Sequence, residues 1–339
     1  MRNSLISADE ISRSFNVDIS GLEQTVQRYP AMINSYYHSL ALEAGNPLLR
    51  QVLPDPEEIS VNNERMTEDP VGEDLYSPVP NLTHRYQDRV LLLISDRCPI
   101  YCRFCTRKRK VGRSLKVTDE TVRDGIKYIR KHPGIRDVLL SGGDPFMLED
   151  VRLEQILSEI RDIPHVEIVR IGTRVPAAYP DRISSDLAAL LSGFSPLYIH
   201  THFNHPAEIT AKSREACRLL ADAGIPLGNQ TVLLRGINDD PDTLETLFRE
   251  LLTMRVRPYY LFQMDAVRGT RHFSTPLMTG VRIMDELRRR TSPMALPTFV
   301  VDLPGGEGKS FPADTSILSP GTKEQAIITP EGKVIPYPD

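Results

Sequence analysis

Three of the four cysteines in this sequence of 339 residues lie close together, as Cys98, Cys102 and Cys105. Their spacing is C-x3-C-x2-C, and clustered thiols in a long chain indicate a metal centre rather than a disulfide framework. Zinc sites normally use two separated pairs of ligands, and the sequence has no second pair. A [4Fe–4S] cluster is normally held by four thiolates, so three on one loop leave one iron free to bind a small molecule. We interpret the three cysteines as cluster ligands rather than as incidental residues of a loop.

A glycine-rich turn, Ser141-Gly142-Gly143-Asp144, follows an apolar run further along the chain. Glycines let the backbone approach a ligand closely, and the Asp144 carboxylate can accept hydrogen bonds from an ammonium group. The turn alone is a weak signal, because such segments are often only turns or helix caps. Together with the cysteine cluster it becomes a strong signal for a ligand site.

A second glycine-rich segment, residues 304–308, precedes Lys309. A P-loop requires G-x4-G-K-[ST] between a strand and a helix. Here Leu303 stands where the first glycine should be, and Pro312 argues against a following helix. Two interpretations remain, a surface turn and a Schiff-base lysine whose amine attacks an aldehyde such as that of pyridoxal 5′-phosphate (PLP). The segment taken alone favours the surface turn.

The elements that must position these residues alternate regularly along the chain. Apolar runs typical of buried strands occupy Val90–Ser95, Asp137–Ser141, Val166–Ile171, Leu197–His202, Gly228–Leu234, Tyr259–Met264 and Thr298–Asp302. Helix-like stretches occupy Asp119–Lys131, Leu153–Ile160, Ser184–Leu191, Ala211–Ala223, Pro241–Leu252 and Gly280–Arg290. Strand alternating with helix predicts parallel strands joined by crossover helices. Six or seven such units predict an α/β fold, a full or partial (β/α) barrel.

Polar residues recur where the predicted strands end, which is where barrels carry their chemistry. Ser141 to Asp144 follows the second run, His202 to His205 follows the fourth, and Gln230 lies at the start of the fifth. Gln263 and Asp265 close the sixth. Any one of these groups is explained by a turn or a cap, but several in register at one barrel face favour a single site.

The regions outside the predicted barrel lack its regular alternation of strands and helices. Residues 1–80 are polar, with loose helical spacing of apolar residues and many helix breakers from Pro54 to Pro80, which predicts a helical N-terminal region that ends in a loop. We expect the barrel to span residues 81–309 and a C-terminal extension to span residues 310–339. Within that extension, Ala326–Thr329 and Lys333–Pro336 predict a small hairpin.

Composition narrows the class of protein. The chain has 41 Lys+Arg against 45 Asp+Glu, a formal net charge of -4, which argues against general nucleic-acid binding. No apolar run approaches the ~18 residues that span a bilayer, and the N-terminus has no apolar signal-peptide core. Clustered thiols in such a chain predict a cytoplasmic protein, with Cys217 an ordinary helix residue.

The motifs together resemble those of the lysine 2,3-aminomutase family of radical S-adenosylmethionine (SAM) enzymes. The resemblance runs through nearly all of residues 80 to 312. It rests on segments 83–86, 88–89, 98–107, 139–144, 201–206, 227–230 and 304–309. It implies a partial barrel of the radical SAM type and three cofactors: a [4Fe–4S] cluster, SAM and PLP. It also implies an electron donor such as flavodoxin or ferredoxin.

The resemblance assigns roles to particular residues. It places Ser141, Gly142, Gly143 and Asp144 at the SAM methionine group, and His202 and Gln230 near SAM. It makes Lys309 the lysine bonded to PLP, with Arg85 and Arg89 near the PLP phosphate. It assigns Arg107 to the substrate carboxylate. The other basic residues around Arg107, namely Arg103, Lys108, Arg109, Lys110 and Arg113, we interpret as a solvated loop.

The resemblance also implies a substrate and a reaction. Family members grip the ε-ammonium of lysine with two aspartates, and the matching positions here are Asp265 and Asp302. The implied reaction is the interconversion of L-lysine and β-lysine, a 1,2-amino migration started by a 5′-deoxyadenosyl radical. Glutamate would need cationic or neutral groups at these positions, since two carboxylates repel a third. Arg268 and Arg271 are alternative partners for Asp265.

Several alternatives stay open at this point. Arginine also satisfies two aspartates, and a short relative acts on lysine destined for elongation factor P. A non-catalytic iron–sulfur protein is a further class, although it would have no need of Lys309, Arg107 and both aspartates. The chain departs from the family at Phe262, often a tyrosine, and at Glu307 within the glycine run. It also lacks the later cysteines that bind structural zinc across subunits in longer members, which leaves a homo-oligomer an open question.

Overall fold

Nine strands form one sheet in the order of the sequence, β1 to β9. The computed structural model describes residues 4–60, 66–113, 115–312, 317–318, 325–328 and 334–337. The strands are β1 (Leu82–Tyr86), β2 (Arg89–Ser95), β3 (Asp137–Gly142), β4 (Ile168–Gly172), β5 (Leu197–Thr201), β6 (Leu227–Leu233), β7 (Val256–Gln263), β8 (Thr298–Asp302) and β9 (Lys309–Ser310). Strands β2 to β8 are parallel to their neighbours. Strands β1 and β9 pair antiparallel at the two ends.

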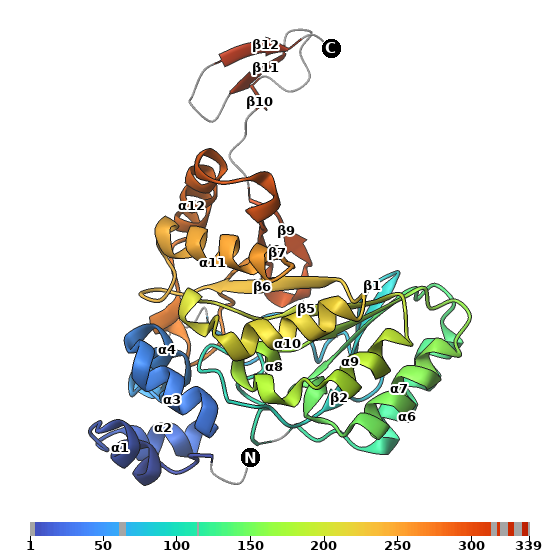
Figure 1. Cartoon of the computed structure of the whole chain (residues 1–339), viewed down its shortest axis with the longest axis horizontal. Coiled ribbons are helices and arrows are strands. Elements are labelled where there is room, and N and C mark those ends of the chain that lie inside the picture. Colours follow the sequence, from blue (N-terminus) through green and yellow to red (C-terminus); the bar gives the residue numbers. More distant parts are fainter. Residues whose placement is uncertain are drawn as a thin grey trace.

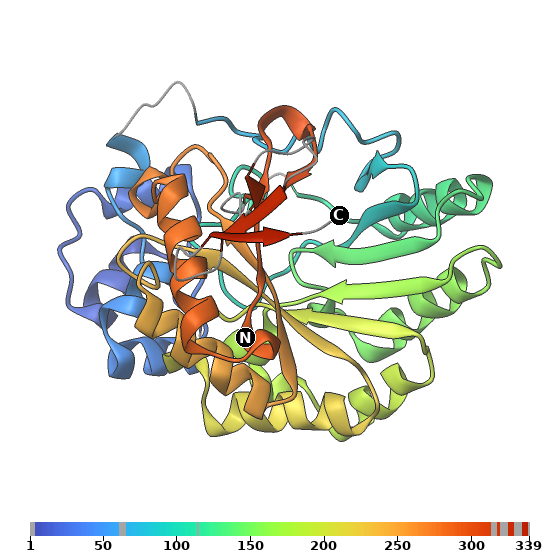
Figure 2. The same cartoon turned by 90° about the horizontal axis from the view of Figure 1, so that it is seen from above.

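Crossover helices cover the outer face of this sheet (Figure 2). They are α6 (Asp119–Lys131), α7 (Asp150–Arg161), α9 (Ser185–Ser192), α10 (Ala211–Asp222), α11 (Pro241–Thr253) and α12 (Leu277–Arg290), with the short α8 (Val175–Ala178) after β4. Helix α6 shows why they form. Thr118 caps its first turn, and Val122, Ile126 and Ile129 recur at helical spacing and are buried. Gly125 on that face lets α6 approach the sheet, since a Cβ there would lie 2.4 Å from Leu92 Cδ1.

The sheet curves into an open barrel, as Figure 2 shows. Its edge strands β1 and β9 lie at opposite ends of the strand order and do not pair with each other. The core is the layer between strands and helices, where strand residues that face the helices, such as Val138, Leu140, Val169 and Ile171, are buried. The predicted partial (β/α) barrel is therefore confirmed, with seven parallel strands.

The N-terminal region is helical, as predicted. It contains α1 (Ala8–Phe15), α2 (Leu22–Arg28), α3 (Ser35–Ala44), α4 (Asn46–Val52) and α5 (Glu57–Ser60) (Figure 1). These helices form a second apolar core that also takes in Ile100 and Ala178 from loops of the barrel. The region therefore packs where the cysteine loop leaves β2. No helix in the described ranges is both long and apolar enough to cross a bilayer.

The C-terminal strands form a separate three-stranded sheet, β10 (Ile317–Leu318), β11 (Gln325–Ile328) and β12 (Val334–Tyr337). Figure 1 shows it set apart from the barrel. Strands β11 and β12 are antiparallel, with Ala326 opposite Pro336, which confirms the predicted hairpin strands. The turn between them lies outside the described residues.

Candidate active site

The three clustered cysteines lie on the loop that follows β2. The N-terminal helices fix the loop backbone: Tyr101 N–H donates to Met32 O and Arg103 N–H donates to Gln51 O, each at 2.9 Å. Within the loop, the Cys105 N–H donates to Cys102 O at 3.2 Å. A local turn therefore brings the last two cysteines together, and the N-terminal region holds that turn against the barrel.

Our interpretation of the basic residues around the loop as solvated is wrong for two of them. Arg103 and Lys108 are buried, and both pair with Glu58, Arg103 Nε at 2.8 Å and Lys108 Nζ at 2.8 Å. Burial, and then the Arg103 charge, lower the pKa of Lys108 to about 8. The spacing of charges along the loop could not show this, because Glu58 comes from α5. These cations anchor the cysteine loop.

The three clustered thiols are half-buried on the loop. All four cysteines are free. Burial, followed by the neighbouring Cys102, raises the pKa of Cys105 to about 11, and burial followed by the other two thiols raises the pKa of Cys98. Among the described residues no three His, Cys, Asp or Glu side chains converge on a single ion. Three thiols on one loop are the kind of donor set that a [4Fe–4S] cluster takes, because each thiolate binds a different iron, and their role as its ligands stays a prediction.

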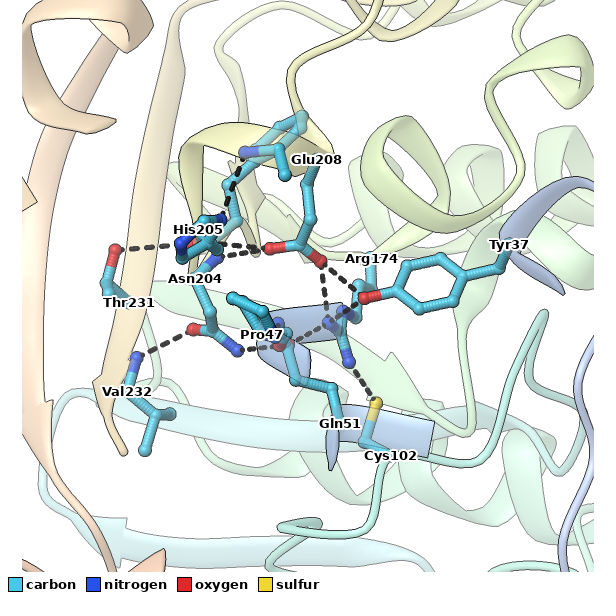
Figure 3. Close-up of polar contacts among 12 residues, drawn as sticks. Tyr37, Pro47, Gln51, Cys102, Arg174, Asn204, His205, Glu208, Thr231 and Val232 are labelled. Atoms are coloured by element: carbon cyan, nitrogen blue, oxygen red, sulfur yellow. Dashed lines mark hydrogen bonds and ion pairs between the residues drawn. The ribbon is translucent and has the colours of Figure 1, made fainter. Parts of the chain in front are cut away.

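A buried polar network reaches the cluster loop from three directions (Figure 3). Arg174, just after β4, donates from Nη1 to Cys102 Sγ at 2.7 Å. Its Nη2 donates to Glu208 Oε1 at 2.7 Å, to Gln51 Oε1 at 2.5 Å and to Tyr37 Oη at 3.3 Å. Glu208 lies after β5, whereas Gln51 and Tyr37 belong to α4 and α3. The network ties the N-terminal helices, the barrel and the cysteine loop together.

Arg174 was missed by the sequence reasoning, although a signal for it existed. Polar residues were sought after the predicted strands, and Thr173-Arg174 follows the third of them in the same way. The cationic guanidinium beside Cys102 would stabilise a thiolate there.

The turn from Ser141 to Asp144 meets the segment before Cys98. A Cβ at Gly142 would lie 2.2 Å from Ser95 O, and one at Gly143 would lie 2.3 Å from Arg97 O. Gly143 N–H and Asp144 N–H donate to those same two carbonyls at 2.6 Å. The glycines are therefore required first by the close approach of the cysteine loop.

Asp144 lies in the interior. Its carboxylate accepts from Phe146 N–H, Thr173 Oγ1–H and Arg174 N–H, at 3.0, 2.8 and 2.7 Å. Burial raises its pKa to about 6 in spite of these donors. The carboxylate thus fixes the loops after β3 and β4 against each other. Its contact with the SAM ammonium stays a prediction.

His202 and Gln230 come from neighbouring strands. His202 follows β5 and its ring centroid lies 5.7 Å from that of Phe104, inside the cysteine motif. Burial and the Arg174 charge lower the pKa of His202 to about 3, so the imidazole is neutral. Its Nε2 is buried without a partner among the described residues. Gln230 is half-buried in β6, and its role at SAM stays a prediction.

Lys309 stands opposite Asp302 on the hairpin of β8 and β9. Gly305, Gly306 and Gly308 all have positive φ and form the turn, which places the amine over the barrel rather than at a helix N-terminus. Lys309 Nζ donates to both carboxylate oxygens of Asp302 at 2.7 Å. It also lies 4.6 Å from the centre of the Phe262 ring. A strand, not a helix, follows the glycines, which excludes a P-loop.

Asp265 is the second predicted aspartate and lies near the first. It accepts from Thr106 Oγ1–H at 2.9 Å. Burial, and next the charge of Asp302, raise its pKa to about 6. Arg268 instead pairs with Glu68 at 3.7 Å, and neither it nor Arg271 forms an ion pair with Asp265 in the described structure. The alternative of a salt bridge from these arginines is therefore excluded, and Asp265 has no cation of its own.

Arg107 is half-buried and paired with Glu73, a residue that the sequence did not single out. Its Nε lies 2.9 and 3.1 Å from the two Glu73 oxygens, and Nη2 lies 2.6 Å from Oε1. Its Nη1 lies 3.4 Å from Ser141 Oγ. Burial opposes the charge of Arg107, but the Glu73 carboxylate raises its pKa above the ordinary value. The guanidinium thus adjoins the turn predicted to hold SAM.

Arg85 and Arg89 lie on β1 and β2, at the open edge of the barrel. Arg85 Nη1 is 3.9 Å from Asp302 Oδ1, and the Arg89 guanidinium lies 3.9 Å from the centre of the Tyr86 ring. Arg85 Nε and Tyr86 Oη are buried with no partner in the described structure. A Cβ on Gly308 would lie 3.7 Å from Tyr86 Oη. Orphaned donors beside Lys309 fit an anionic group such as the phosphate of PLP.

The fold and the three-cysteine loop define a radical SAM enzyme, and the Radical SAM superfamily model matches residues 92–247. The chain is 44% identical over 343 residues to L-lysine 2,3-aminomutase of Fusobacterium nucleatum, covering 99% of this chain and 80% of that protein. It is also 44% identical to the L-lysine 2,3-aminomutase of Clostridium subterminale, covering 99% of this chain and 82% of that protein. The chain therefore belongs to the lysine 2,3-aminomutase family, and it is an isomerase.

The family alone leaves the substrate undecided. The glutamate 2,3-aminomutase of Clostridioides difficile is also 44% identical, over 310 residues, 91% of this chain and 73% of that protein. A choice between a basic and an acidic substrate therefore has to come from the charges in the site.

Proposed function

We propose that this protein is a lysine 2,3-aminomutase that interconverts L-lysine and β-lysine. The observation that carries the proposal is the pairing of Asp302 with the Lys309 ammonium, next to Asp265, which forms no ion pair among the described residues. The ammonium of Lys309 thus already pairs with Asp302, one of the two aspartates that the substrate's ε-ammonium would contact.

Three cofactors fit the residues described above. Cys98, Cys102 and Cys105 would hold the [4Fe–4S] cluster, and the turn from Ser141 to Asp144 would receive SAM with His202 and Gln230. Lys309 would bond to PLP, with Arg85 and Arg89 at the phosphate. SAM on the cluster supplies a hydrogen-abstracting radical, and PLP supplies a carrier for the migrating amino group.

The protein's own residues orient the substrate and exclude water. Arg107 would hold the carboxylate at one end, and Asp265 and Asp302 would hold the ammonium at the other. With its amine engaged by PLP, Lys309 would no longer pair with Asp302 as a free ammonium. The two half-buried carboxylates would then favour a cationic ligand, because an unpaired charge away from water is costly.

The same charges disfavour glutamate. Its side-chain carboxylate would be the third anion beside Asp265 and Asp302, with no cation of the chain paired to Asp265 in the described structure. Arginine satisfies the charge requirement as well as lysine does, so the competing basic substrate has to be separated by experiment.

The test is anaerobic turnover of the reconstituted protein with SAM and a reductant, supplied in turn with lysine, arginine and glutamate. We expect β-lysine as the main product. Asp265→Asn and Asp302→Asn should each abolish most of it, whereas Asp181→Asn, in an exposed ion pair with Lys212, should not. Formation of β-glutamate without β-lysine would overturn the proposal.

We further propose a one-electron donor such as flavodoxin or ferredoxin as partner, because a cluster that cleaves SAM has to be reduced. Free thiols at the cluster loop support a cytoplasmic setting. The proposed electron donor is tested by pull-down with immobilised flavodoxin, followed by reduction of the cluster.

A further inference from the structure

A segment that the sequence marked only as breaker-rich touches several parts of the site. We call residues 67–76 the strap. It starts beside Asp265, where Thr67 N–H donates to Ala266 O and Arg268 N–H donates to Thr67 O, both at 2.9 Å. It then reaches the hairpin of β8 and β9, which carries Lys309 and which we call the lysine hairpin. There Gly305 N–H donates to Pro70 O at 2.9 Å.

The strap fits the lysine hairpin tightly. A Cβ at Gly306 would lie 2.4 Å from the Tyr76 ring, and one at Gly72 would lie 3.0 Å from Gly305 O. The Arg85 guanidinium donates to Val71 O. The strap therefore contacts the surroundings of Asp265, Lys309 and Arg85.

Glu73 is the strap residue that enters the site. Its backbone is fixed by the Asp69 side chain, which accepts from Glu73 N–H at 3.0 Å, and by Ser77 Oγ–H, which donates to Glu73 O at 2.6 Å. The side chain is buried, and its carboxylate pairs with Arg107. The strap itself is tied to the loop beyond the cysteines by Lys110, 2.7 Å from Asp74.

The geometry of the pair leaves half of the guanidinium free. Glu73 takes the edge formed by Nε and Nη2. Among the described residues, the second edge, formed by Nη1 and Nη2, has only the long contacts of Nη1 with Ser141 Oγ at 3.4 Å and Gly142 O at 3.5 Å. A guanidinium is planar and presents two forked edges, so fixing one edge fixes the direction of the other.

We propose that Glu73 is a positioning residue for the substrate carboxylate: it locks Arg107 so that the Nη1/Nη2 edge receives that carboxylate. This rests on the proposed function, in which Arg107 binds an amino acid carboxylate. The opposite arrangement, with Glu73 as an occupant that the substrate must displace, conflicts with the edge it uses and with the many contacts that hold the strap.

The test compares two ligands that differ in one group. Lysine and cadaverine both carry two amines, and only lysine carries a carboxylate. Each is titrated into the PLP-loaded protein without SAM, so that no turnover occurs, and the visible absorbance change of PLP gives Kd. Wild type is compared with Glu73→Gln, and with Glu68→Gln as a matched control, since Glu68 lies on the strap but pairs with Arg28 and Arg268.

We expect Glu73→Gln to raise the Kd of lysine about tenfold, because charge-assisted bonds that fix Arg107 are lost. The Kd of cadaverine should stay within about twofold of wild type, because cadaverine has no carboxylate for Arg107 to bind. Glu68→Gln should change neither. Glu73→Asp, which keeps the charge on a shorter side chain, should give an intermediate rise for lysine and serves if Glu73→Gln does not fold.

Four results would overturn the inference. Tighter lysine binding by Glu73→Gln would make Glu73 a competitor, and equal losses for lysine and cadaverine would make its role purely structural. Unchanged lysine binding would remove any role. If wild type binds lysine no better than cadaverine, Arg107 is not the carboxylate site and the inference fails, whereas the lysine assignment fails only if turnover gives β-glutamate without β-lysine.

Discussion

At the scale of single residues, the substrate-binding role proposed for Asp265 would depend on pH. Its pKa of about 6 comes from burial first, then from the charge of Asp302, with Thr106 and Lys309 acting in the opposite direction and Glu73 adding a small rise. Below that pH the carboxyl is neutral and cannot pair with an ammonium. The ε-ammonium itself stays charged to about pH 10.

We therefore predict a pH-dependent effect of Asp265→Asn on lysine binding. The ratio of the Kd of the variant to that of wild type should be near one below about pH 5, where wild type is also neutral, and should rise to a plateau above about pH 7. The ratio cancels the pH dependence of bonding to PLP, which both proteins share. A ratio that is flat across this range would contradict the prediction.

Residue identity and local spacing were enough to single out the cysteine cluster, whereas the roles predicted for Lys309 and the two aspartates came from the family resemblance. Identity and spacing were not enough for Glu73, which meets Arg107 across 34 residues, or for Arg174, which meets Cys102 across 72 residues. Such pairs depend on how the loops fold over the barrel, and no periodicity in the sequence encodes that folding. The basic loop was misread for the same reason, because Glu58 is remote in sequence from Arg103.

At the scale of elements, the cysteine loop depends on the glycines that follow β3. Gly143→Ala would place a Cβ 2.3 Å from Arg97 O, a backbone atom that cannot move without moving the loop. We predict that this variant binds less than about half of the wild-type iron after reconstitution, as expected when the supporting shell of a metal site is disturbed. Iron analysis measures it.

Gly134→Ala is the matched control, since its Cβ would meet only Gln87 O at the ordinary distance of 3.5 Å. It should retain the iron content of wild type. Full iron content in Gly143→Ala would contradict the prediction, because the loop would then bind the metal in another conformation.

Long amphipathic elements were predicted well and edge elements were not. Helix α6 and strand β8 have the predicted bounds, because caps and continuous apolar runs mark them. Strand β1 was not predicted, since only its first residue is fully buried, and β9 has only two residues. These two edge strands carry Arg85 and Lys309. A polar edge strand near a ligand carries little of the hydrophobic pattern on which prediction relies.

At the scale of the whole molecule, the Arg174 network joins the N-terminal helices to the barrel. Breaking a buried ion pair leaves an uncompensated charge in the interior. We predict that Glu208→Gln lowers the free energy of unfolding by about 3 kcal/mol, measured by urea denaturation of the cofactor-free protein. Asp181→Asn removes a pair whose side chains are 57% and 54% exposed and should cost less than about 1 kcal/mol. If both variants lost a similar free energy of unfolding, the burial of the Arg174–Glu208 pair would not explain its contribution to stability.

The pairing of Lys309 with Asp302 has a consequence for the order of assembly. In the proposed function, Lys309 would bond to PLP and Asp302 would receive the substrate's ammonium. The chain without PLP would then hold its own lysine at the substrate position, as a tethered ligand with a high effective concentration. An amino acid would bind there only to molecules that already carry PLP.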